Sequence, residues 1–185
     1  MENRIRNGTI YLTEMTEDYL LDIHAYASIQ EASKYQPWGP NSLSDTIAYL
    51  EEILAENKKE KRSRLVFAVI EKENNKMIGA GELFHIDFSN KNGEIGYIIH
   101  PEFWGKGIAT QVANILIDLG FKELKLNRIY ATCDARNSAS EKVLKKIGMK
   151  QEGLLRENIL LADGWRDSLL YSILNREWHT KRQEE

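Results

Sequence analysis

The stretch that decides the fold is YIIHPEFWGKGIAT, residues 97–110. It has the pattern of a strand end, a short glycine loop, and a helix that begins at Ile108. The first turn of a helix has unpaired N–H groups and a partial positive charge, so a phosphate placed there gains several hydrogen bonds. Glycines at 105 and 107 let the backbone approach the phosphate because they carry no Cβ. The pattern predicts that Gly105 to Thr110 cradle a pyrophosphate.

Two other phosphate-binding patterns fit this stretch less well. A P-loop requires Gly-Lys-Ser/Thr, but Gly107 is followed by Ile108. The dinucleotide fingerprint requires a third glycine where Thr110 stands. Two glycines alone are a weak signal, so a tight turn that binds no ligand is the alternative at this point.

Outward from this stretch, periodicity and turn residues predict the remaining elements. Strands are expected over 8–13, 65–70, 76–86, 93–99, 128–133, 149–160 and 165–173, the last two joined across Ala162-Asp163-Gly164. Helices are expected from a cap at Thr16 to about 30, from Ser42 or Ser44 to about 59, from Ile108 to about 124, and from a cap at Asn137 to Gly148. Residues 31–42 are expected to form a loop, and the charged tail 175–185 to fray. This order predicts an α/β fold, a mixed sheet of about seven strands with helices on both faces, in one domain spanning residues 1–185 with its core at 8–173.

Composition narrows the class of protein. The chain has 185 residues, 42% of them apolar and 29% charged, with a net charge of −3. That balance is typical of a globular domain and gives no reason to expect nucleic acid as a partner. Cys133 is the single cysteine, so no disulfide can form within the chain, as expected of a cytoplasmic protein. The polar N-terminus does not resemble a signal peptide, and no apolar run is long enough to predict a membrane helix.

Three separated motifs resemble one family, the GNAT N-acetyltransferases. Trp104-x-x-Gly107-x-Ala109 is similar to that family's motif A, usually Gln/Arg-x-x-Gly-x-Gly/Ala, with a tryptophan in the first place. Residues 137–149, NSASEKVLKKIGM, and 164–171, GWRDSLLY, resemble two segments of the RimJ/RimL-like branch, which acetylates ribosomal-protein N-termini. The resemblance covers residues 8–173 and implies the GNAT fold and acetyl-CoA as the cofactor.

The resemblance also implies how coenzyme A would bind. In this fold the parallel strands at 93–99 and 128–133 splay apart, and the pantetheine arm pairs with an exposed backbone edge as an added strand would. Asn137 would contact that arm while also capping its helix. Lys142, with Lys145 and Lys146, would meet the adenosine 3′-phosphate, or else form a solvated helix face. The expected cofactor-binding residues are Ile98, Ile99, Trp104, Gly105, Lys106, Gly107, Ile108, Ala109, Thr110, Asn137, Ser140 and Lys142.

The reaction requires a neutral amine that attacks a thioester. The resemblance suggests Glu94 as the catalytic base; the alternative is an ordinary exposed strand residue, and Glu157 is a second candidate. Ser140 would hydrogen-bond the leaving thiolate, and the N–H of Ile99 would stabilise the oxyanion. Cys133 is expected to be buried and inert, so the amine would attack directly in a ternary complex.

The amine acceptor stays open at this stage. Tyr35 and Trp38 lie in the loop that borders the acceptor site in this family, as either an acceptor wall or an anchored lid. A protein N-terminal α-amine, a polyamine, an amino acid or an antibiotic are all compatible with the residues, as is a homodimer. The histidines show no metal-ligand spacing, so no metal is expected. A module that binds acyl-CoA without turnover is the non-enzymatic alternative.

Overall fold

The computed structural model describes residues 5–161 and 163–184, with backbone alone at 5–7 and 181–184; Ala162 of the expected hairpin loop lies outside this part. Within these residues eight strands form one mixed sheet in the order β1-β2-β3-β4-β5-β6-β8-β7. The three-residue β1 adds one strand to the expected seven. The strands are β1 (Ile5–Asn7), β2 (Ile10–Glu14), β3 (Leu65–Glu71), β4 (Lys76–Asp87), β5 (Asn92–Ile99), β6 (Arg128–Asp134), β7 (Lys150–Leu161) and β8 (Gly164–Leu174).

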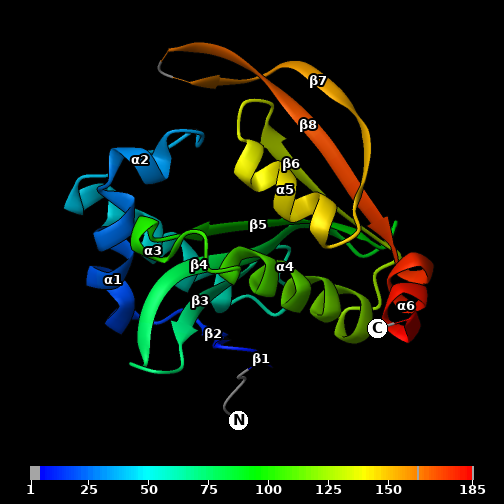
Figure 1. Ribbon diagram of the computed structural model, residues 1–185. Coiled ribbons are helices and arrows are strands. Elements are labelled where there is room, and N and C mark those ends of the chain that lie inside the picture. The colour runs from blue at the N-terminus through cyan, green and yellow to red at the C-terminus, as the bar shows by residue number, and fades with distance from the viewer. Residues whose placement is uncertain (1–4, 162, 185) are drawn as a thin grey trace.

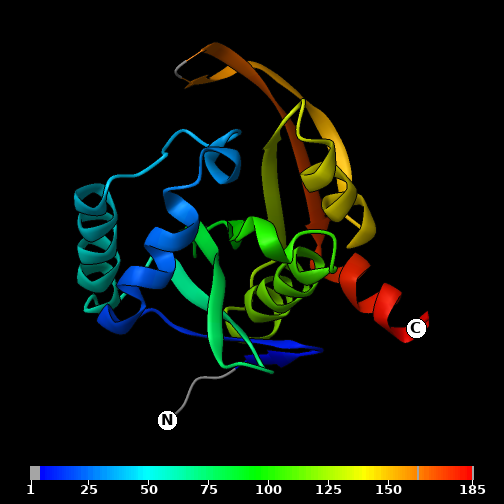
Figure 2. The same cartoon turned by 60° about the vertical axis from the view of Figure 1, so that its left-hand side comes forward.

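The helices cover both faces of this sheet, as predicted (Figures 1 and 2). Single-turn elements occur at Glu17–Tyr19 and Pro101–Phe103, and a π-helical turn at Leu119–Glu123 follows α4. The α-helices are α1 (Leu20–Ala27), α2 (Gln30–Ser33), α3 (Leu43–Asn57), α4 (Ile108–Asp118), α5 (Ser138–Lys146) and α6 (Asn175–Glu184).

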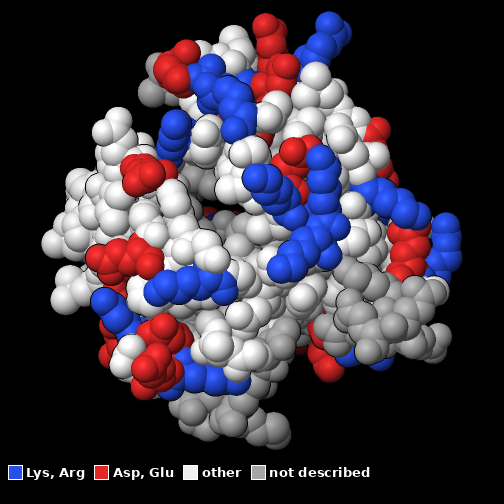
Figure 3. All heavy atoms as spheres, viewed as in Figure 1, with Lys and Arg blue, Asp and Glu red and all other residues white. Residues whose placement is uncertain are grey.

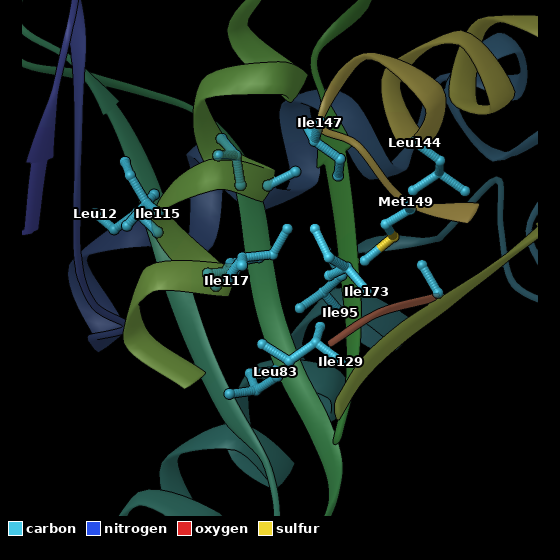
Figure 4. Close-up of a cluster of buried hydrophobic side chains, with 14 of the residues drawn as sticks. Leu12, Leu83, Ile95, Ile115, Ile117, Ile129, Leu144, Ile147, Met149 and Ile173 are labelled. Atoms are coloured by element: carbon cyan, nitrogen blue, oxygen red, sulfur yellow. The ribbon is translucent and has the colours of Figure 1, made fainter. Parts of the chain in front are cut away.

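Two cores flank the sheet because successive strand residues point to opposite faces. In β2, Ile10 and Leu12 join the core built on α4, whereas Tyr11 joins the core built on α1 and α3. The same alternation explains the continuous apolar run of β3, in which both faces are covered. In Figure 4 the side chains of Ile95, Ile129 and Ile173 lie together near Ile117. This packing joins β5, β6 and β8 to α4.

The pairing of β5 with β6 is short, and this feature creates the site. Only Asn92–Arg128, Gly93–Ile129 and Glu94–Tyr130 are in register between these two parallel strands. Beyond Glu94, β5 keeps its ladder with β4 to Ile99, while β6 keeps its ladder with β8 to Asp134. The two strands therefore diverge, as the resemblance implied (Figure 1).

The helix predicted from Thr16 to about residue 30 is confirmed over Glu17–Ala27, where it begins with a single 3₁₀ turn and ends earlier than expected. Thr16 makes no side-chain cap, and the α-helix begins only at Leu20. It ends at Ala27, where the Ser28 hydroxyl bonds to the carbonyl of His24 at 2.8 Å. The separate turn α2 then occupies part of the expected loop 31–42. Of the two caps considered for α3, the structure uses Ser42, in a capping box with Asp45.

The tail also differs from the expectation of fraying, because α6 packs against the body of the protein. Trp178 is only 2% exposed and belongs to the α4 core. Its indole N–H donates to Asp118 Oδ1 at 2.9 Å, and Lys150 pairs with Glu177 at 2.6 Å. Fraying was predicted from the many charged residues of this segment, whereas its one buried aromatic residue, Trp178, attaches it to the core.

We expect Trp178→Ala to lower the free energy of unfolding by roughly 3–5 kcal/mol, the usual cost of truncating a buried aromatic residue. Trp178→Phe keeps most of the buried apolar area and should cost considerably less. Urea unfolding followed by circular dichroism measures both variants. A loss below about 1 kcal/mol for the alanine variant would show that α6 does not dock as described.

Candidate active site

A cavity of about 1220 Å³ opens where β5 and β6 diverge. It is lined by β4, β5 and β6, by the loop after α2, by α3 and by the β7–β8 hairpin. Figure 3 shows a hollow at the middle of this face, with basic side chains beside it over α5. The lining includes Glu82, Glu94, Tyr97, Ser140, Tyr35 and Trp38.

The glycine loop that leads into α4 has open space in front of its backbone. Gly105 and Gly107 adopt positive φ angles of 76° and 74°. A Cβ added at either position would meet nothing within 4 Å. Trp104, Lys106 and both glycines are exposed, Ala109 and Thr110 are half-buried, and Ile108 is buried in the core. The first turn of α4, whose N–H groups have no partner within the helix, therefore begins beside open space.

The ladder between β4 and β5 determines which backbone groups face the gap. His100 donates its N–H to the carbonyl of Ile78 at 2.8 Å, and bonding alternates along an antiparallel pair. The backbone of Ile98 is therefore directed at β4, whereas the backbones of Tyr97 and Ile99 face the gap. The carbonyl of Ile99 accepts a hydrogen bond from the Trp104 indole at 2.7 Å. Ile98 and Ile99 were both expected to offer backbone groups to the gap. Ile99 does so, but the backbone of Ile98 faces β4, and Tyr97 is the second residue whose backbone faces the gap. Adjacent residues of a strand direct their backbone groups to opposite sides, which the sequence prediction did not take into account.

Glu94 lies at the last paired position before the strands diverge. It is 8% exposed, so the reading of an ordinary exposed strand residue was wrong. Thr132 donates its hydroxyl to Glu94 Oε1 at 2.8 Å, and His85 Nδ1 lies 3.1 Å from Glu94 Oε2. Sequence reasoning missed both partners, because a bulge in β4 between Phe84 and Asp87 brings His85 to this position. Burial, followed by the charge of Glu94, raises the pKa of the neighbouring Tyr130.

Ser140 lies against Tyr97 on the other face of the sheet. Its Oγ is 3.1 Å from the Tyr97 hydroxyl, and its N–H donates to Asn137 Oδ1 at 3.1 Å, which confirms the helix cap. Burial raises the pKa of Tyr97 to about 12, so this hydroxyl stays protonated at neutral pH. Tyr97 was missed, although a single hydroxyl in the apolar run Ile95–Ile99 is a usable signal.

Cys133 lines the cavity but is protonated. Burial, with smaller contributions from the charges of Glu141 and Asp134, raises the pKa of its thiol to about 11. A thiol is a poor nucleophile until it ionises. The prediction that Cys133 is buried is confirmed.

The remaining predicted residues divide between the cavity and the surface. Tyr35 and Trp38 both line the cavity, and the Arg136 guanidinium lies 5.7 Å from the Tyr35 ring centroid. Glu157 is exposed, does not line the cavity, and donates its N–H to Asp167 at 2.8 Å. Lys142 is exposed on α5, whereas Lys145 pairs with Glu141 at 2.7 Å.

The two faces of the sheet contribute different groups. Glu94 and Ile98 point to the face of α1 and α3, whereas Ile95, Tyr97 and Ile99 point to the face of α4. The hydroxyl pair of Tyr97 and Ser140 thus lies on one face and the buried carboxylate on the other, and all three residues line the cavity, whereas the loop before α4 does not. No group of three or more His, Cys, Asp or Glu side chains in the described part of the chain is placed to hold a metal ion.

Two parallel strands that diverge, together with an open glycine loop at the start of the following helix, are the features of a GNAT acyltransferase. The family model for the acetyltransferase (GNAT) domain matches residues 9–150, and the chain belongs to this family. It is 33% identical over 157 residues to the uncharacterized N-acetyltransferase YnaD of Bacillus subtilis, covering 85% of this chain and 88% of that one. A GNAT acetyltransferase structure from Bacillus anthracis superimposes with a TM-score of 0.81 at 31% identity, covering 94% and 99% of the two chains. The protein is therefore an acetyl-CoA-dependent N-acetyltransferase.

Two further relatives carry named acceptors. The putative ribosomal N-acetyltransferase YdaF of Bacillus subtilis is 37% identical over 106 residues, covering 57% of this chain and 58% of that one. Spermidine N(1)-acetyltransferase of Escherichia coli is 30% identical over 100 residues, covering 54% of each. No helix among the described residues has the length and apolar character that crossing a membrane requires.

Proposed function

We propose that this N-acetyltransferase acts on a primary amine by direct attack, with Glu94 as the base, and that the acceptor is a protein N-terminal α-amine. One observation carries the proposal: a buried carboxylate lines the cavity where the two strands part, on the same strand that ends just before the open loop of α4. The first turn of α4 and residues 104–107 would hold the pyrophosphate of acetyl-CoA. Asn137 would contact the pantetheine arm, and Lys142 the 3′-phosphate.

The chemistry of the amine supports an α-amine acceptor. Neutralising an α-amine of pKa about 8 at pH 7 costs roughly 1.4 kcal/mol, against about 4.6 kcal/mol for a lysine side chain. A carboxylate that takes the proton directly or through one water suffices for the first. Thr132 and His85 hold the carboxylate of Glu94 in one orientation.

The transition state would be stabilised from the opposite strand face. The N–H of Ile99 faces the gap and is placed to donate to the oxyanion. The hydroxyls of Ser140 and Tyr97 would donate to the departing thiolate. Because the pKa of Tyr97 is raised to about 12, its hydroxyl would act as a neutral hydrogen-bond donor. The protonated thiol of Cys133 favours direct attack over an acyl-enzyme.

Similarity to the RimJ/RimL-like branch and to YdaF supports the protein α-amine. A small polyamine is the second candidate, and two observations favour it. A spermidine N(1)-acetyltransferase is among the relatives. The cavity wall also carries more carboxylates than cationic groups: Asp45, Glu52, Glu82, Glu94 and Asp134 against Arg64.

We expect purified protein to release free coenzyme A from acetyl-CoA when N-terminal peptides that begin with a small residue are supplied. Thiol release, detected with a chromogenic disulfide, and the mass of the acetylated product measure this across peptides, polyamines, amino acids and aminoglycosides. The intact mass of the protein after incubation with acetyl-CoA alone should not change, since no acyl-enzyme forms. Coenzyme A binding without turnover on any amine would instead favour a non-catalytic acyl-CoA module.

A further inference from the structure

A second carboxylate, Glu82 on β4, lies on the same strand face as Glu94. Glu82 is in register with Gly96, and Phe84 is in register with Glu94. Residues directly opposite in an antiparallel pair point to the same side, so Glu82 and Glu94 are diagonal neighbours, roughly 7–8 Å apart at the backbone. Both line the cavity. This relation follows from the register and was not visible in the sequence.

The glycine opposite Glu82 leaves the space into which its carboxylate folds. A Cβ added at Gly96 would lie 3.3 Å from Glu82 Cγ, from Glu82 Oε1 and from Phe84 Cε1. The carboxylate therefore lies over the backbone of β5 at the cavity wall, on the same strand face as Glu94. A longer side chain at position 96 would separate the two carboxylates.

Arg64, which immediately precedes β3, fixes the other oxygen of this carboxylate. Its Nε donates to Glu82 Oε2 at 2.8 Å, and its Nη1 donates to Glu52 Oε1 at 3.0 Å. One guanidinium thus serves two carboxylates, and the group keeps a net negative charge. Burial, and then the charge of nearby groups including Glu82, raises the pKa of Tyr26 and of Tyr49, so these phenols stay neutral and add no charge to the wall.

We propose that Glu82 is a specificity-determining residue that binds a second cationic group of the acceptor while the reacting amine lies beside Glu94. The inference rests on the proposed function, because it takes Glu94 as the reaction centre. Its ligand chemistry is a dication with two positive groups several ångströms apart. A diamine supplies this, and so does a peptide with lysine next to its N-terminal residue.

The test compares acceptors that differ by one charge. The wild type should show a kcat/KM for putrescine that is roughly tenfold or more above that for butylamine, or a similar ratio for an Ala-Lys peptide over an Ala-Gln peptide. The acceptor without a second positive charge cannot form the charge-assisted hydrogen bond to Glu82. Glu82→Gln should bring the ratio close to one. Glu51→Gln removes the same charge from an exposed site on α3 and should keep the wild-type ratio. Calorimetry of putrescine with the protein alone should show the same order among the variants.

The possible outcomes distinguish a failure of the inference about Glu82 from a failure of the proposed function. A ratio unchanged in Glu82→Gln would overturn the inference and leave the Arg64 pair a structural one. Preference in only the diamine arm, or only the peptide arm, supports the inference and identifies the source of the dication. If Glu82→Gln does not fold, Gly96→Ala gives the second test, because its methyl group would lie 3.3 Å from Glu82 Cγ and Oε1, must shift the side chain by a few tenths of an ångström, and should lower the same ratio. Wild-type activity with no preference in either arm contradicts the inference alone, whereas no activity on any amine contradicts the proposed function.

Discussion

Gly107→Asp is expected to raise the Kd for coenzyme A by 100-fold or more, while the protein stays folded. The φ of 74° at this position is one that aspartate and asparagine tolerate, at a cost of about 1–2 kcal/mol. A Cβ at this exposed position meets nothing within 4 Å, so the substitution places no atom against the neighbouring backbone. A negative charge at the start of a helix is favourable to the helix itself, yet it occupies and repels the place of a diphosphate. The variant should therefore lose affinity for coenzyme A while its free energy of unfolding changes little.

Gly107→Asn is the matched control, since it has nearly the same shape and strain but no charge. Its affinity should fall far less than that of the aspartate variant, and both should have melting temperatures close to each other. Calorimetric titration with coenzyme A and thermal unfolding without it make the comparison. An aspartate variant that binds coenzyme A as well as the parent would disprove the proposed cradle.

Glu94→Gln is expected to lower kcat by roughly 10²–10⁴-fold, the usual contribution of a positioned general base. Glutamine keeps the size of the side chain and can still accept from Thr132, so coenzyme A affinity and stability should change little. Steady-state kinetics with saturating acetyl-CoA, together with a direct binding measurement, separate the two effects.

Glu157→Gln tests the competing base and serves as the control. Glu157 is exposed and lies outside the cavity lining, so the variant should retain the parental kcat. A large loss in Glu157→Gln with none in Glu94→Gln would reverse the assignment. If kcat fell in neither variant, water or the amine's own ionisation would suffice to remove the proton, and no carboxylate base would be needed.

Much of the scaffold was predictable because it depends on residues close together in the chain. Glycines at 105 and 107 predicted a short loop before a helix that begins at Ile108, and the structure confirms that start of α4. Asn137 was identified as a helix cap from its place before an amphipathic segment, and its side chain accepts from Ser140 as expected. The error at the tail arose because one long-range contact, that of Trp178 with Asp118, outweighed local composition.

The sequence by itself determined the order of the main strands and helices, the glycine loop before α4, and the three motifs that resemble the family. These properties depend on φ preferences, capping and apolar periodicity, all of which act over a few residues. Only the tertiary structure decided which groups meet: His85 with Glu94, Tyr97 with Ser140, and Glu82 over Gly96. The register of β4 on β5, and the residue at which β5 leaves β6, are set by pairing and core packing between distant segments. A side chain's position along its own strand does not specify which neighbour it faces across the next one.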